Sequence, residues 1–247
     1  ASLAEGQRKC AEGLLLWFQE LKSNPEWNTL PGAIPGDADR PLSDVYVELS
    51  AIEESEVIQA DEAETGRRIS SLSQQRGDHA ISVDSMIART LERCVVVGDP
   101  GSGKSTLVKW LVWATFREKL PDFDIAIEVK LSAFAKALSD GSKITPLEFF
   151  FRSLGQNAEE ARMAATSLRN AARATQRYLL LLNGWDEVPV EQRGIVKEQL
   201  LEEERALITL ITSRPSGMPR QLIDGRRVGC YRIAGLTPAM AEELTTK

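Results

Sequence analysis

The run at positions 98–106 constrains this 247-residue chain more than any other feature. It fits the pattern G-x-x-x-x-G-K-[ST], a glycine-rich loop whose backbone cradles phosphate groups. An apolar run at 94–97 precedes it, and apolar side chains at helical spacing follow it. Strand, glycine loop and helix form the context that this pattern needs, so the sequence predicts a phosphate-binding loop. Its residues are Gly98, Asp99, Pro100, Gly101, Ser102, Gly103, Lys104, Ser105 and Thr106.

The residue types in this loop suit anionic oxygens. Glycine adopts backbone angles that are closed to other residues, so successive N–H groups can form a nest for phosphate. The helix expected from Lys104 adds its positive end, and the Lys104 ammonium would contact the β- and γ-phosphates. Ser105 would give its hydroxyl to Mg²⁺, and Thr106 is expected at the α-phosphate. The alternative is a glycine- and serine-rich turn before a surface helix, which the flanking patterns disfavour.

Composition argues against several other classes of protein. The net charge of −6 disfavours a nucleic-acid-binding surface dominated by Lys and Arg. The single histidine and the three widely spaced cysteines disfavour a histidine triad or a Cys/His metal cluster, and they indicate a reducing, cytoplasmic setting. No stretch has the length of a membrane span, and no signal peptide is expected. The first residue, Ala1, and the end at Lys247 suggest a fragment of a longer protein.

Hydrophobic periodicity predicts alternating strands and helices along most of the chain. Helices are expected at 3–22, 83–93, 157–176 and 190–204, and from the Thr-Pro pairs at 145–146 and 237–238. Strands are expected at 45–49, 94–97, 125–131, 178–182, 206–212 and 228–233, with a linker at 23–40 and a polar excursion at 50–80. Leu15 and Ile195 are expected on apolar helix sides. Strands separated by helices imply an α/β fold with a mainly parallel sheet and helices on both sides.

Two further motifs follow predicted strands. Asp186 and Glu187 come after the apolar run at 178–182, at the end of a neighbouring strand, where carboxylates can hold Mg²⁺ or orient an attacking water. Arg214 closes the run Thr212-Ser213-Arg214, on the side of the sheet that lines a ligand crevice. The alternatives are an acidic turn and a surface arginine before proline. Because the glycine loop lies upstream, a functional role is favoured for Asp186 and Glu187. For Arg214 taken alone, a surface arginine before a proline turn is favoured.

In this order the three motifs resemble the NACHT family, in the STAND class of signalling NTPases within the additional-strand branch of P-loop proteins. The resemblance covers residues 42–244 and rests on the glycine loop, on the Asn-Gly-Trp-Asp-Glu run at 183–187 and on the Thr-Ser-Arg run at 212–214. It implies a three-layer P-loop NTPase fold with an N-terminal helical extension. The expected division is a helix and linker at 1–41, the nucleotide-binding domain at 42–235 and the start of a helical subdomain at 236–247.

The resemblance also implies ligands and partners. ATP or ADP would bind with Mg²⁺, with GTP as the alternative, and the nucleotide would control self-association in an immune, antiphage or stress response. An N-terminal effector and a C-terminal sensor would flank the chain, without membrane or nucleic acid as partner. The implied residues are Asp186, Glu187 and Arg214 for catalysis, Ser105, Asn183 and Asp186 for the metal, and Tyr46 and Val47 for the base.

Asn183 departs from the family pattern, which has aspartate there as the expected Mg²⁺ ligand. An amide keeps the shape and loses the charge, so the sequence predicts weak or absent hydrolysis with nucleotide binding retained. Replacing Asn183 with Asp is then expected to raise phosphate release. Asn183 is compatible both with a natural sequence and with a substitution engineered to trap a nucleotide-bound state. Two other classes remain: a non-hydrolysing nucleotide-dependent scaffold, which Asn183 favours, and a nucleic-acid motor, which the acidic balance disfavours.

Overall fold

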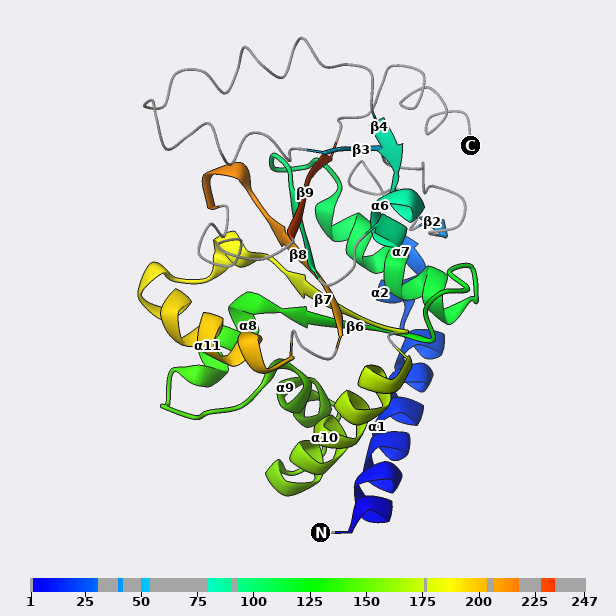
Figure 1. Ribbon diagram of the computed structural model, residues 1–247, viewed down its shortest axis with the longest axis vertical. Coiled ribbons are helices and arrows are strands. Elements are labelled where there is room, and N and C mark those ends of the chain that lie inside the picture. Colours follow the sequence, from blue (N-terminus) through cyan, green and yellow to red (C-terminus); the bar gives the residue numbers. More distant parts are fainter. Residues whose placement is uncertain are drawn as a thin grey trace.

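A seven-stranded sheet forms the centre of the molecule (Figure 1). The computed structural model describes residues 2–30, 40–41, 50–53, 80–89, 93–175, 177–203, 207–217 and 228–233. Two short strands, β3 and β4, extend a parallel group of strands in antiparallel fashion at one edge. In spatial order the strands are β4 (Ala80–Ser82), β3 (Ser50–Glu53), β9 (Val228–Ile233), β5 (Arg93–Val97), β8 (Ile208–Ser213), β7 (Tyr178–Asn183) and β6 (Ile125–Lys130).

Helices lie on both sides of this sheet (Figure 1). The loop helix α7 (Lys104–Phe116) contacts β6, β7 and β8, while α8 (Leu131–Leu138) and α11 (Arg193–Glu203) lie on the other side. Around the β6 end are α1 (Leu3–Ser23), α9 (Pro146–Ser153) and α10 (Ala158–Thr175). The three-layer α/β fold is thus confirmed. The shorter elements are α2 (Pro25–Asn28), α6 (Val83–Arg89) and the antiparallel pair β1 (Thr29–Leu30) and β2 (Arg40–Pro41).

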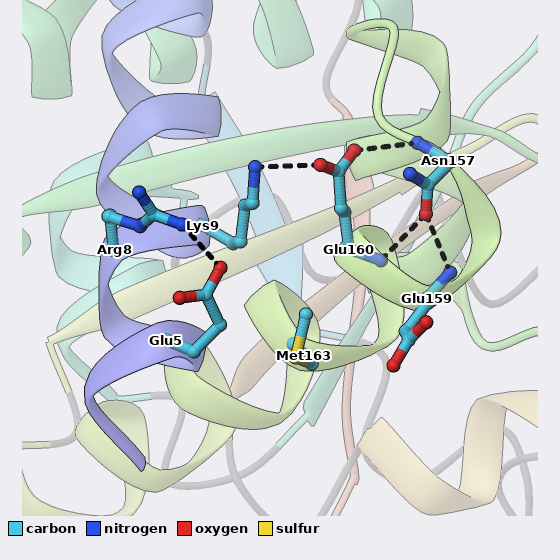
Figure 2. A pocket seen from close by; sticks show the side chains of 7 residues that line it. All are labelled: Glu5, Arg8, Lys9, Asn157, Glu159, Glu160 and Met163. Atoms are coloured by element: carbon cyan, nitrogen blue, oxygen red, sulfur yellow. Dashed lines mark hydrogen bonds and ion pairs between the residues drawn. The ribbon is translucent and has the colours of Figure 1, made fainter. Parts of the chain in front are cut away.

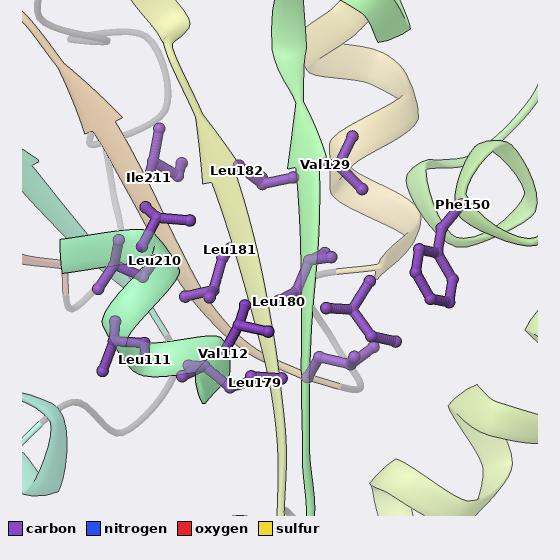
Figure 3. Close-up of a cluster of buried hydrophobic side chains, with 14 of the residues drawn as sticks. Leu111, Val112, Val129, Phe150, Leu179, Leu180, Leu181, Leu182, Leu210 and Ile211 are labelled. Atoms are coloured by element: carbon purple, nitrogen blue, oxygen red, sulfur yellow. The ribbon is translucent and has the colours of Figure 1, made fainter. Parts of the chain in front are cut away.

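The core is apolar on both faces of β7, as Figure 3 shows. All four leucines at 179–182 are at most 1% exposed. Leu111 and Val112 of α7 lie on one side of the strand, and Val129 and Phe150 lie on the other. A parallel strand between two helical layers is covered on both faces, which explains why its sequence is an unbroken apolar run.

The N-terminal helix α1 covers the outer edge of the sheet. The indole N–H of Trp17 donates to the carbonyl of Ala126 in β6, the last strand in the sheet order, at 3.3 Å. Lys9 pairs with Glu160 of α10 at 2.7 Å. An edge strand presents unpaired backbone groups that invite other chains, and a packed helix protects them. This helix therefore packs as part of the domain.

Four predictions about local structure were wrong. The linker at 23–40 contains α2 and β1, and the polar excursion at 50–80 begins and ends in β3 and β4. β3 and β4 are too short to show a hydrophobic period; β3 is held by pairing with β9, and β4 by pairing with β3. Leu15 and Ile195 are 61% and 48% exposed, because they point away from the buried faces that carry Trp17 and Val196.

The other predicted elements are confirmed within a few residues wherever the structure describes them. The helix expected at 190–204 starts at Arg193, after a 3-10 turn at Val190–Gln192. The strand at 45–49 and the helix from 237 lie outside the described residues. Within the described ranges, no helix combines the length and the apolar character that a membrane crossing requires.

Candidate functional site

The glycine loop joins β5 to α7 in a tight backbone turn. Gly103 adopts a left-handed φ of 94° as it caps α7, a conformation that favours glycine. A Cβ on Gly98 would lie 2.3 Å from the Ser102 hydroxyl oxygen, so a side chain at position 98 would force the Ser102 side chain to move. This tight turn, at the start of a 13-residue helix, fits a phosphate group.

Lys104 lies across this loop. Its ammonium donates to the carbonyls of Gly98 at 2.7 Å and of Asp99 at 2.9 Å. Burial lowers the pKa of Lys104, the charge of Asp186 opposes that shift, and Arg214 adds to it. A phosphate oxygen would be a stronger acceptor than these neutral carbonyls, because it is charged.

The remaining loop residues surround this lysine. Ser105 is exposed and Thr106 is half-buried in the first turn of α7. Pro100 and Gly101 are exposed at the loop tip, and the Ser102 N–H donates to the Asp99 carbonyl at 3.1 Å. The Ser105 hydroxyl is therefore accessible to a ligand at the loop.

Asp186 and Arg214 form an ion pair where β7 and β8 end. The Arg214 guanidinium Nε lies 3.0 Å from Asp186 Oδ2, and the Arg214 backbone N–H donates to Oδ1 at 3.0 Å. The Arg214 side chain is 52% exposed and that of Asp186 is 13% exposed. Both charges influence the pKa of Lys104, and the Gly98 N–H donates to the carbonyl of Ser213, the residue before Arg214, so the ion pair lies beside the loop.

Glu187 points to a different neighbour. Its Oε2 accepts a hydrogen bond from the Ser132 hydroxyl at 3.1 Å, at the start of α8. Trp185, next to the acidic pair, is 1% exposed and packs in the core. The two adjacent carboxylates thus have separate partners.

Asn183 sits in a hydrogen-bonded chain across three strands. Its amide nitrogen donates to Glu128 Oε1 at 2.8 Å, and its amide oxygen accepts from the Thr212 hydroxyl at 2.7 Å. The Gly184 N–H donates to that hydroxyl at 2.9 Å. Burial raises the pKa of Glu128, and the hydrogen bond from Asn183 opposes the shift.

The sequence reasoning missed Glu128. A signal was present, because Glu128 is the only charged residue at an interior position of the β6 run Ile-Ala-Ile-Glu-Val-Lys. Its neighbours Ile127 and Val129 are at most 1% exposed. A carboxylate among such residues has to be explained by a partner or by a function.

The end of β8 connects the other motifs. Thr212 binds Asn183, the Ser213 carbonyl accepts from the Gly98 N–H at 3.2 Å, and Arg214 binds Asp186. The expectation that the acidic strand neighbours the loop strand was wrong, because β8 lies between β5 and β7. Three consecutive residues thus contact both the glycine loop and the 183–187 run, which are distant in sequence.

The oxygen donors present fit Mg²⁺ in kind. Ser105 offers a hydroxyl, Asn183 an amide oxygen and Asp186 a carboxylate, and Mg²⁺ prefers such oxygens beside phosphates. Among the described residues, no group of three or more His, Cys, Asp or Glu side chains could hold a metal. Beside a nucleotide, Mg²⁺ needs only one or two protein ligands.

A separate hollow of about 490 Å³ lies between α1 and the start of α10 (Figure 2). Its charged side chains pair with one another, Arg8 with Glu5 at 2.6 Å and Lys9 with Glu160 at 2.7 Å. No predicted site residue lines this hollow. We therefore place the candidate site at the glycine loop and the adjoining ends of β7 and β8.

The fold and this site define a P-loop NTPase in which an additional strand separates the loop strand from the acidic strand. The model of the NACHT domain family matches residues 92–247, and the chain belongs to this family of nucleotide-binding NTPases. No curated protein matches the chain. A solved structure of C. elegans PCH-2 aligns with 16% identity and a TM-score of 0.38, over 73% of this chain and 42% of that one. The chain thus spans less than half the length of that protein.

Proposed function

We propose that this domain is a signalling switch that binds ATP or GTP with Mg²⁺, hydrolyses it slowly and changes its self-association with the nucleotide state. Lys104 would hold the phosphates, while Ser105 and Asn183 would face the metal. The main support is the end of β8, where Thr212, Ser213 and Arg214 contact Asn183, Gly98 and Asp186 respectively. A change at the phosphates would therefore reach the acidic residues through this segment.

Arg214 would act as the sensor of the γ-phosphate. It is half exposed and bound to Asp186, so a triphosphate would compete with Asp186 for its guanidinium. Release from Arg214 would leave the Asp186 carboxylate free to orient a water, with Glu187 as the second candidate. Arg214 would thus pair with Asp186 when a diphosphate is bound and with the γ-phosphate when a triphosphate is bound.

Binding is tested first on the purified 247-residue chain. Mass spectrometry after heat release identifies any co-purified nucleotide; ADP supports the closed switch, and GDP would change the base assignment. Titration with fluorescent ATP and GTP analogues then gives affinities. Lys104→Ala should abolish binding, whereas Lys143→Ala, at an exposed position outside the loop, should not. Equal affinities for both variants and the parent chain would contradict the assigned site.

Hydrolysis is tested by phosphate release. We expect turnover below about 0.01 per second, the range of P-loop switches without an activator. A carboxylate at 183 would face Glu128 across the present 2.8 Å contact, so Asn183→Asp is best combined with Glu128→Gln. This double variant should release phosphate faster. No gain would refute the assignment of Asn183 as the limiting residue.

A non-hydrolysing scaffold is the second candidate, and Asn183 is the observation that favours it. Phosphate release above the Lys104→Ala blank excludes this candidate. Self-association is measured by light scattering with ADP and with a non-hydrolysable ATP analogue. A larger particle with the ATP analogue is expected from the switch, and an unchanged mass would contradict it.

Family membership supports a proposal about the wider context. We propose immune, antiphage or stress signalling in the cytoplasm, with an effector before and a sensor after the NTPase domain. Cys10, Cys94 and Cys230 are buried and form no disulfide, which fits a reducing setting. The divisions at 1–41, 42–235 and 236–247 stay predictions. So does the base pocket at Tyr46 and Val47, which lie outside the described residues.

A further inference from the structure

The amide of Asn183 has a fixed orientation. The Thr212 hydroxyl accepts the Gly184 N–H, so its single proton is directed to the Asn183 oxygen. The nitrogen end of the amide must then point the other way, where Glu128 accepts from it. Hydrogen-bond chemistry alone therefore decides which end of the amide faces which strand.

The strand order shows which part of the site each end of the Asn183 amide faces. β7 lies between β6 and β8, and β8 lies next to the loop strand β5. The Asn183 oxygen therefore faces the glycine-loop side of the sheet, and the nitrogen faces β6. Glu128 pairs with Leu181, two residues before Asn183 on the same face, so its side chain reaches Asn183 diagonally.

The loop helix α7 covers the same corner. Lys130, the register partner of Asn183, lies 3.7 Å from Glu26, which is also 3.8 Å from Lys109 of α7. Lys109 follows Ser105 by four residues, so both lie on one side of that helix. The contact between Glu128 and Asn183 thus lies beside the face of α7 that carries the predicted metal ligand Ser105.

Keeping a carboxylate at position 128 is costly. Glu128 is partly buried in a strand whose other interior residues are apolar. Its carboxylate loses hydration there, whereas a leucine side chain at the same position would have no such cost. Residues that break a local rule of the fold in this way are often found at functional sites. The contact with Asn183 identifies what Glu128 acts on.

We propose that Glu128 is a positioning residue that holds the Asn183 amide oxygen toward the glycine loop, where it is available to Mg²⁺ or to its water ligands. This proposal rests on the proposed function and names the carboxylate that supports the metal side. Asn183 then supplies an oxygen where the family has aspartate, and the negative charge sits one hydrogen bond behind it. Outer carboxylates of this kind orient metal ligands and commonly change metal affinity 10–100-fold when they are removed.

The test compares two replacements of Glu128. Glu128→Gln keeps an oxygen that can accept from Asn183, whereas Glu128→Leu removes the acceptor and fits the apolar strand. For each protein, the affinity for fluorescent ATP is measured with Mg²⁺ and with EDTA, and the ratio is the Mg²⁺ enhancement. Thermal unfolding without nucleotide is measured alongside. We expect the enhancement to be kept within about threefold in Glu128→Gln and reduced about tenfold in Glu128→Leu, with no lower melting temperature.

A second comparison tests whether Glu128 acts through Asn183. In an Asn183→Ala background, Glu128→Leu should have no further effect on the Mg²⁺ enhancement. An added loss there, or equal enhancement in the parent chain and Glu128→Leu, overturns the proposal. So does a drop in melting temperature with unchanged enhancement, since that result indicates a structural role only. Failure of the parent chain to bind nucleotide at all would instead refute the proposed function.

Discussion

Gly217 offers the sharpest test of the acidic end of the site. It ends a 3-10 turn, Pro215–Gly217, that packs on Asp186. A Cβ at this position would lie 2.6 Å from the Asp186 Cβ and 3.0 Å from its Cα. Carbon atoms pack at about 3.5–4.0 Å, so Gly217→Ala forces a movement of about 1 Å between the two turns. A movement of this size along either 3.0 Å contact between Asp186 and Arg214 would take that contact beyond hydrogen-bond range.

Two quantities should change in Gly217→Ala. Overpacking of this size costs about 1–3 kcal/mol, which lowers the melting temperature by about 2–12 °C for a chain of this length. Misplacement of Asp186 by about 1 Å should slow single-turnover phosphate release about 10–100-fold. Nucleotide affinity should stay within about threefold, because the glycine loop is not contacted. The assays are thermal unfolding, phosphate release and fluorescent-nucleotide titration on the same preparations.

Gly194→Ala is the matched control. An added Cβ there meets nothing within 4 Å, and the residue lies inside α11. Alanine in place of glycine within a helix should stabilise the protein by about 0.5–1 kcal/mol and leave phosphate release unchanged. If Gly217→Ala behaved like Gly194→Ala in both assays, the steric reasoning would be refuted. If it lost stability and kept full phosphate release, Asp186 would have no part in hydrolysis.

Three further changes test packing, capping and charge. Gly13→Ala would place a Cβ 2.5 Å from the Phe151 ring, so α1 should become sensitive to limited proteolysis; an equally resistant helix would contradict this packing. Thr145→Ala removes the cap of α9 and should cost about 1 kcal/mol in urea unfolding, whereas Thr145→Ser should cost less. Because burial raises the pKa of Glu128, the folded state loses stability as pH rises above the ordinary glutamate range. Glu128→Gln should therefore melt at the same temperature as the parent chain in acid and higher at neutral pH; a constant difference between pH 4 and 7 would contradict the shift.

The sequence predicts the central strands well, and the reason is burial. β5, β7, β8 and β9 fall within two residues of the expected ranges, and β5 and β7 in particular are short apolar runs with buried interiors. Such runs are typical of strands that are covered on both faces. The glycine loop and the start of α7 can also be predicted from the sequence, because the residues of one short turn determine both.

The helix α8 shows where local patterns fail. Its buried residues Leu131, Phe134, Ala135 and Leu138 have helical spacing, yet the helix was not predicted. It follows β6 directly, with Lys130 at the cap position and no capping side chain. Without a glycine, proline or cap to mark a boundary, the start of a helix resembles the end of a strand.

The role proposed for Glu128 could not be predicted from the sequence, for a different reason. Its partner Asn183 is 55 residues away, and the contact exists only because β6 and β7 pair in one register. A shift by one residue would turn Glu128 to the opposite face of the sheet. The sequence shows a carboxylate in an apolar run, but only the register shows what it binds.

The position of β8 decides how the site can respond to its ligand. Because β8 separates β5 from β7, the glycine loop and the acidic residues are joined through the residues that end β8. Gly98 is tied to Ser213, Asn183 to Thr212 and Asp186 to Arg214. A phosphate that pulls Arg214 from Asp186 acts on the same backbone segment that anchors the loop and orients Asn183. Phosphate sensing and metal positioning should therefore be coupled, so a variant that fixes Arg214 on Asp186 should also change the Mg²⁺ enhancement of nucleotide binding.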